Sequence, residues 1–115
     1  MIPKGLLMSS FKKLQKTLGV TSAEFVRITR ISLRTLQRRQ KSGKFLPDES
    51  ERIFRLSCAV DQALHVMRDE EAARSWMNMP IKALSYETPL NYIDTETGIR
   101  EVEQVLGRIE HGVFS

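Results

Sequence analysis

Residues 21–43, TSAEFVRITRISLRTLQRRQKSG, read as two short helices separated by a connection of about three residues, the size expected of a helix-turn-helix. Thr21 and Glu24 have the spacing of a capping box, in which a hydroxyl and a carboxylate satisfy the first turn of a helix. Ser32 can cap the second helix, expected at Leu33–Ser42, and Gly43 can end it. This stretch therefore predicts a compact helical domain of a kind that commonly binds DNA.

The helix expected at Leu33–Ser42 divides into two faces when its residues are placed at intervals of about 100°. Leu33 and Leu36 fall together on one side, and Ile31 is available to cover the same core. The opposite side carries cationic and hydroxyl side chains, namely Arg34, Thr35, Arg38, Lys41 and Ser42. A helix that enters the major groove of DNA needs apolar anchors behind it and hydrogen-bonding groups in front. The alternative is an amphipathic surface helix that happens to be basic.

The candidate DNA contacts come from this helix and from basic residues that precede it. Arginine can read guanine, a glutamine can pair with adenine, and a residue at a helix N-terminus can meet a phosphate. Lysines upstream can contact the DNA backbone whatever its sequence. The candidate set is Arg30, Ser32, Arg34, Thr35, Gln37, Arg38, Lys41, Lys12 and Lys13. RNA is the less favoured partner, because no aromatic residue for stacking bases lies among these side chains.

The charge of the chain is strongly polarised, although its net value is only +4. Residues 1–47 carry eleven Lys and Arg and one Glu, which leaves +10, whereas residues 48–115 carry seven Lys and Arg and thirteen Asp and Glu, which leaves −6. Such polarity suggests a polyanionic partner for the first half. Charge alone is equally compatible with a solvated basic face, and the helical pattern is what favours DNA.

Length and composition indicate one compact domain, or two small helical units that share a core. Of the 115 residues 41% are hydrophobic and 28% charged, which supports a core. No apolar run approaches the ~18 residues that would span a bilayer. The apolar run near the N-terminus is too short for a secretory signal. The single cysteine, Cys58, excludes an internal disulfide and fits a reducing compartment. We expect a cytoplasmic protein with no membrane partner.

Glycine and proline residues separate further helices, and no segment shows the sustained alternation of a strand, so the predicted fold class is all-α. The expected helices are Phe11–Leu18 capped by Ser10, Pro47 to about Met67, a helix after Asp69 that ends before Pro80, a brief turn after Thr88-Pro89, and about Thr97 to His111. In the last helix an apolar seam comprises Ile99, Val102, Leu106, Ile109 and Val113. This seam favours an internal helix contact over a dimer interface.

One group of residues could imitate an enzyme site. Cys58, Asp61 and His65 can share a helical face, but the rise from Cys58 to His65 is ~10 Å, too far for a direct thiol–imidazole bond. A zinc site would need more ligands than the one further histidine, His111, can supply. We expect Cys58 and Trp76 to be packed residues. The chain is predicted not to be an enzyme, with no catalytic residue, metal, cofactor or small-molecule substrate.

Three segments of the second half carry an ordered set of motifs. They are Ala73-Arg-Ser-Trp-Met-Asn-Met-Pro80, Leu84 through Thr88-Pro-Leu90, and Thr95-Glu-Thr-Gly-Ile-Arg-Glu-Val102 followed by Leu106-Gly-Arg-Ile-Glu-His-Gly-Val113. This order resembles the C-terminal domain of the Xre/MbcA/ParS-type antitoxins. Upstream, Ile31 to Arg39 and Leu46 to Arg52 resemble the helix-turn-helix and following helix of the same family. Family members usually have a glycine pair where this chain reads Leu84-Ser-Tyr-Glu87.

The resemblance implies an antitoxin of a type II toxin–antitoxin system. The implied protein partner is a RES-domain toxin that consumes NAD, whose active site the antitoxin occludes. The implied nucleic-acid partner is operator DNA, through which the antitoxin represses its own operon. The resemblance also implies a homodimer within the complex. The implied toxin-binding residues are Arg108, Gly112, Val113, Phe114 and Ser115, although Phe114 could instead fold back onto the core. The expected domains are residues 1–46 for DNA binding, 47–68 as a connecting helix and 69–115 for toxin binding. The alternative is a stand-alone regulator whose second half only dimerises.

Overall fold

The structure is a computed structural model that describes residues 4–112, with side chains described from Phe11 onward. Its elements are α1 (Lys4–Leu18), α2 (Ser22–Thr29), α3 (Leu33–Ser42), α4 (Pro47–Met67), α5 (Glu70–Met77), a 3-10 turn η1 (Lys82–Leu84), α6 (Pro89–Tyr92) and α7 (Glu96–Glu110). Between residues 4 and 112 there is no named strand, and Ile81 forms an isolated antiparallel bridge with Glu87. The all-α prediction is confirmed.

Local capping signals place most helix ends where the sequence predicts them. The Glu24 amide donates to the Thr21 hydroxyl at 3.2 Å, and the Glu24 carboxylate accepts from the Thr21 amide at 3.2 Å, which completes the predicted capping box. Helix α3 has its predicted bounds, from the Ser32 cap to Gly43 at φ +68°. The predicted start of the first helix is wrong, because α1 begins at Lys4 and runs through Ser10. No proline interrupts residues 4–10, so the helix continues toward the N-terminus instead of starting at a cap.

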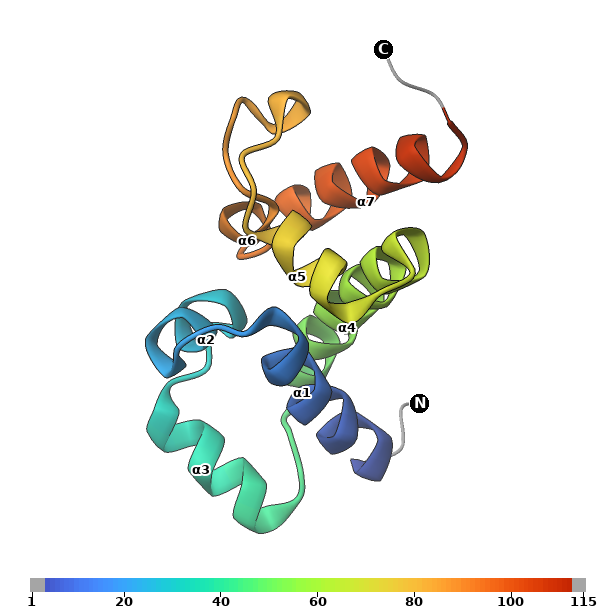
Figure 1. The fold of residues 1–115 in the computed structure, drawn as a ribbon. Helices are drawn as coiled ribbons and strands as arrows, with labels where there is room; N and C mark the ends of the chain where they lie inside the picture. The colour runs from blue at the N-terminus through green and yellow to red at the C-terminus, as the bar shows by residue number, and fades with distance from the viewer. Residues whose placement is uncertain (1–3, 113–115) are drawn as a thin grey trace.

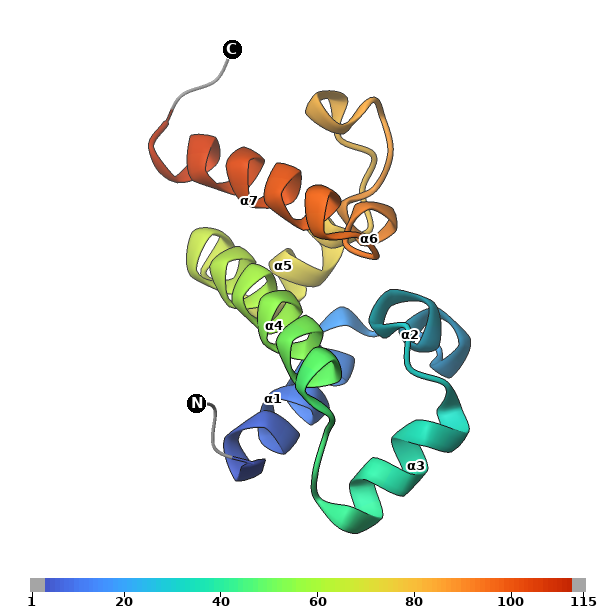
Figure 2. The same cartoon turned by 180° about the vertical axis from the view of Figure 1, so that it is seen from behind.

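Helix α4 is the axis of the molecule. It contacts α1 and α2 on the N-terminal side and α5 and α7 on the C-terminal side. In Figures 1 and 2, α3 lies at one end and α7 toward the other, with α2 and α6 between them, and the body measures 46 × 26 × 25 Å. One stripe of α4 is apolar, with Ile53, Leu56, Val60 and Ala63 buried and Met67 partly buried. One long amphipathic helix thus supports both halves of the chain.

The core is continuous between the two halves. In the first half the ring of Phe11 packs at a tilt beside those of Phe25 and Phe45, whose centroids lie 5.0 and 5.7 Å from its own. In the second half Trp76 is buried, as predicted. The α7 seam is buried at Ile99, Val102 and Leu106 and partly buried at Ile109, so its described part is an internal contact, while Val113 lies outside the described residues. None of the helices described between residues 4 and 112 combines the length and hydrophobicity needed to cross a bilayer.

The prediction that Cys58 is a packed residue is wrong, because it is exposed on α4. Cys58 is two positions from both Leu56 and Val60, so at about 100° per residue it lies roughly opposite the buried stripe. Partial desolvation and the carboxylates of Asp61 and Glu103 raise the pKa of the thiol, which therefore stays protonated at neutral pH. Within the described residues no group of three or more potential ligands is placed to hold a metal ion.

A close turn joins α6 to α7 and explains one glycine of the sequence motif. Thr95 caps α7 through its hydroxyl, which accepts from the Gly98 amide at 3.0 Å. A Cβ atom added to Gly98 would lie 1.7 Å from the carbonyl oxygen of Tyr92, which is backbone and has little freedom to move. The Thr-x-x-Gly pattern at residues 95–98 therefore combines a helix cap with a position that no side chain can occupy.

The loop that departs from the family's glycine pair keeps a glycine-like backbone. Ser85 has φ +57° and Tyr86 has φ +65°, both in the left-handed region. For residues with a Cβ atom this conformation costs on the order of 1 kcal/mol each. The loop therefore adopts this shape although neither residue favours it.

Candidate functional site

Helix α3 projects from the end of the molecule opposite α7, and its outer side faces away from the body (Figures 1 and 2). The predicted contacts Arg34, Gln37, Arg38 and Lys41 are all exposed, and Thr35 is half-buried. Arg34, Arg38 and Lys41 are spaced i, i+4 and i+7, so they share one stripe of the helix. We call these three residues the basic stripe.

The basic stripe is available to an external anion. Within the described part of the chain, no carboxylate lies within ion-pair distance of any of its three members. Three cations held close together on one helix repel each other unless phosphates or other anions neutralise them. The arrangement suits a polyanion that runs along the helix.

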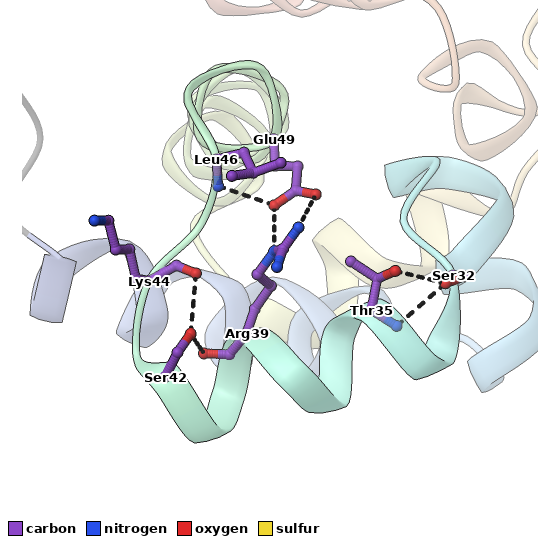
Figure 3. A network of polar contacts seen from close by, with 7 residues as sticks. All are labelled: Ser32, Thr35, Arg39, Ser42, Lys44, Leu46 and Glu49. Carbon is purple, nitrogen blue, oxygen red and sulfur yellow. Dashed lines mark hydrogen bonds and ion pairs between the residues drawn. The ribbon is translucent and has the colours of Figure 1, made fainter.

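Ser32 and Thr35 hold the start of α3 (Figure 3). The Ser32 oxygen accepts from the Thr35 amide at 3.2 Å, and its hydroxyl donates to the Thr35 hydroxyl at 2.9 Å. Both hydroxyls thus have a structural task before any DNA is bound. The Ser32 cap leaves the positive end of the helix dipole exposed beside the basic stripe, where a phosphate is favoured.

The prediction that Leu33 anchors α3 in the core is wrong, because its side chain is 50% exposed. Leu36, Ile31 and Phe45 are buried and hold the helix at its middle and at its two ends. The first turn of α3 therefore extends past the core, which places Leu33 on the surface next to Arg34.

Arg39 holds α3 in place, a role that the sequence did not reveal. Its guanidinium donates to Glu49 of α4 through Nε at 2.8 Å and through a terminal nitrogen at 3.2 Å, and the same carboxylate accepts from the Leu46 amide at 3.0 Å (Figure 3). The two side chains are only 18% and 9% exposed. This two-pronged ion pair joins the C-terminal half of α3 to the first turn of α4, so it sets the angle at which the basic stripe is presented.

We expect Glu49→Gln to lower the free energy of unfolding at pH 7 by about 1 to 3 kcal/mol, because it weakens charge-assisted bonds that are shielded from water. The bonds from Arg39 hold the pKa of the Glu49 carboxyl below its usual range. Its contribution to stability is therefore present above the ordinary glutamate pKa and lost as the pH falls through the lowered value. Denaturant unfolding of both proteins from pH 7 to pH 3 measures this, and the difference between them should shrink as the pH falls.

Glu51→Gln is the matched control for this experiment. Glu51 is also on the first turns of α4, but its side chain is 68% exposed. It lies 3.7 Å from Arg55, and a surface ion pair of this kind contributes little to stability. Equal stability of Glu49→Gln and wild type at pH 7 would show that the Arg39–Glu49 pair does not fix α3.

The remaining predicted DNA contacts lie off the basic stripe. Arg30 is the exposed left-handed cap of α2 and lines a cleft of about 370 Å³ between α2, α4 and the start of α7. Lys12 is exposed on α1. Lys13, also exposed, lies 3.5 Å from Asp61 of α4, so its charge is partly balanced within the protein. These three residues are peripheral to the surface that α3 forms.

Two arginines tie the halves of the chain together. Arg27 of α2 donates to Asp94 and to Asn91, both at 3.3 Å. In the opposite direction, Arg74 of α5 donates to the carbonyl oxygens of Thr17 at 3.1 Å and Lys16 at 3.2 Å, which satisfies the last turn of α1. Each half therefore supplies an arginine to the other, and the orientation between them is specified by hydrogen bonds as well as by the core.

The predicted toxin-binding residues follow from the end of α7. Arg108 is exposed on its last turn, and Gly112 is exposed at φ +69° in the turn that follows. Val113, Phe114 and Ser115 lie outside the described residues. Val102 and Leu106 are buried, which fixes α7 against the core.

Comparison with known proteins connects both surfaces to one family. Residues 1–57 match the antitoxin Xre-like helix-turn-helix domain, and residues 62–112 match the antitoxin Xre/MbcA/ParS C-terminal toxin-binding domain. Antitoxin Xre of Yersinia enterocolitica is 43% identical over 84% of this chain and 67% of its own length. Antitoxin Xre of Photorhabdus laumondii is 38% identical over 97% of this chain and 77% of its own length.

A more distant relative spans nearly the whole chain. The Prs ADP-ribosylating antitoxin of a Sphingobium species is 26% identical over 99% of this chain and 78% of its own length. The two family matches, in this order, correspond to the end of the molecule that carries α3 and the end that carries α7. The chain therefore belongs to the Xre/MbcA/ParS antitoxin family, whose members are regulators and not enzymes, and it joins that family's helix-turn-helix to its toxin-binding domain.

Proposed function

We propose that this chain neutralises a RES-domain toxin that consumes NAD, by occluding the toxin's active site, and that it represses its own operon through α3. The observation that carries the proposal is the position of the basic stripe, exposed and free of internal ion pairs in the described part, at the end opposite the toxin-binding domain. Two partners can then be held by one chain without competing for the same surface.

In this proposal the DNA-binding unit is residues 1–46. Arg34 and Arg38 read base edges in the major groove with Thr35 and Gln37, because side chains on the outer face of a recognition helix reach the bases. Lys41 and the exposed N-terminus of α3 at Ser32 contact phosphates, which fix the register on the duplex. Smaller contributions to DNA affinity come from Lys12, Lys13 and Arg30, since they lie off the basic stripe.

The toxin-binding unit is residues 69–115, carried on the connecting helix 47–68. Arg108 and Gly112 direct residues 113–115 into the toxin's cleft, where Phe114 is a large apolar anchor of the kind that dominates protein interfaces. The name of the Sphingobium relative associates that protein with ADP-ribosylation, a reaction that also uses NAD, and this favours an NAD-consuming toxin as the partner.

A homodimer completes the proposal. Helix-turn-helix proteins bind paired half-sites as dimers, because a second recognition helix one helical turn away increases both affinity and specificity. We propose that two copies of this chain bind one operator as a homodimer within the toxin–antitoxin complex.

Co-expression with a RES-domain toxin tests the function. We expect the toxin to stop growth when expressed alone, and growth to be restored when this chain is co-expressed and co-purifies with the toxin. Failure of rescue by a chain that still binds its operator would contradict the antitoxin proposal and favour a stand-alone regulator.

A further inference from the structure

The loop between α5 and α6 presents an aromatic ring that the fold does not use. Tyr86 is 67% exposed, the most exposed of the large hydrophobic side chains described. Its backbone lies at φ +65° next to Ser85 at φ +57°, a region that L-residues rarely adopt and that a bulky residue enters only when its surroundings impose it. Figure 1 shows this loop rising from the body at the end opposite α3.

Backbone hydrogen bonds, and not the tyrosine side chain, impose this turn. The Tyr86 amide donates to the carbonyl oxygen of Ile81 at 2.9 Å, and the Ile81 amide donates to that of Glu87 at 3.0 Å. The side chain that anchors the loop in the core is Leu84, which is 1% exposed. A glycine at position 86 would keep each of these bonds and remove the backbone strain, so the fold by itself gives no reason for a tyrosine there.

A second exposed apolar side chain lies in the same loop. Met79 is 48% exposed, so of the five large hydrophobic residues described as exposed, two belong to residues 78–88. Tyrosine is enriched at interface hot spots, and methionine adapts to the shape of a partner surface. Because the loop is already held in one conformation by its hydrogen bonds, binding through it loses little conformational entropy.

We propose that Tyr86, supported by Met79, is a second anchor for the toxin, separate from the C-terminal residues. The loop lies inside residues 62–112, the part that matches the toxin-binding domain, so the occupant we assign is the toxin and not DNA. The complementary surface is an apolar pocket with a polar rim that accepts the tyrosine hydroxyl. This inference rests on the proposed function.

Tyr86→Gly tests the anchor, because a merely structural tyrosine and a binding tyrosine give opposite results. We expect the variant to be at least as thermally stable as wild type, yet to bind a catalytically inactive RES-domain toxin about 10- to 100-fold more weakly in titration calorimetry. Met79→Ala should give a smaller loss. Operator binding should not change in either variant.

Ser85→Gly is the matched control, since it removes the same kind of strain one residue away and keeps the ring. It should bind the toxin with wild-type affinity. Equal toxin affinity for Tyr86→Gly and Ser85→Gly would overturn the proposal, as would a weakened self-association of Tyr86→Gly with toxin affinity unchanged, because the ring would then contact a second copy of this chain. If the wild-type chain itself does not bind a RES-domain toxin, the proposed function fails. If the wild-type chain binds the toxin and Tyr86→Gly binds it equally well, only the proposed anchor fails.

Discussion

Replacing both Arg34 and Arg38 with alanine should weaken binding to the operator between about 30-fold and 10⁴-fold. A well-placed arginine contributes about 1 to 3 kcal/mol to recognition of its base, so losing two costs about 2 to 6 kcal/mol. Both side chains are exposed, so the substitutions should leave the fold intact. Fluorescence anisotropy with a duplex from upstream of the coding sequence, repeated over a salt series, measures the loss and any change in the number of released counterions.

The matched control removes two cations from the other end of the molecule. Lys82 and Arg100 are exposed in the C-terminal half, and the double variant Lys82→Ala/Arg100→Ala has the same net charge as Arg34→Ala/Arg38→Ala. It should retain nearly all operator affinity. Equal binding by the two double variants would mean that charge alone attracts DNA and that α3 is not the recognition helix.

Removing residues 113–115 should abolish neutralisation of the toxin and leave operator binding largely unchanged. Helix α7 packs on α4 with Val102 and Leu106 buried, and it ends at Glu110, before the residues removed. A lost aromatic anchor and its neighbours typically weaken an interface by 2 kcal/mol or more, about 30-fold. Growth during co-expression and calorimetry with an inactive toxin measure the effect.

Point variants show which removed residue matters. Phe114→Ala should reproduce most of the loss, whereas Phe114→Tyr, which keeps the ring, should retain most of the affinity. Full neutralisation by the truncated chain would contradict a mechanism in which the C-terminal residues occlude the toxin's active site.

Helix ends that depend on neighbouring residues were predictable from the sequence. The capping box at Thr21 and Glu24 and the Ser32 cap each act over three residues, and the structure contains both. The start of α1 was not predictable in this way, because residues 4–10 carry neither a proline nor a decisive cap and the helix simply continues through them. Capping residues thus predict a helix end, whereas a helix end without a clear cap has to be seen in the structure.

Features of the site that depend on tertiary contacts were not predictable. The Arg39–Glu49 pair joins two helices, so the helical pattern of α3 alone does not reveal the partner of Arg39. Leu33 was expected in the core because a helical projection gives direction but not depth, and α3 extends past the core at its first turn. The Glu49 capping position, three residues after Leu46, was the one signal that could have drawn attention to this pair.

The left-handed backbone of Ser85 and Tyr86 could not be predicted from the sequence, because serine and tyrosine both disfavour that conformation. Only the hydrogen bonds around Ile81 explain why the backbone becomes left-handed there. A residue that contradicts its local preference without gaining burial points to a role outside the fold.

The central claim is that the two ends of this chain serve different partners. Amide hydrogen exchange of the chain alone, with operator DNA and with an inactive RES-domain toxin measures it directly. We expect DNA to add protection within residues 30–44, and the toxin to add protection within residues 79–88 and 108–112. Added protection of α7 by DNA, or of α3 by the toxin, would contradict the claim.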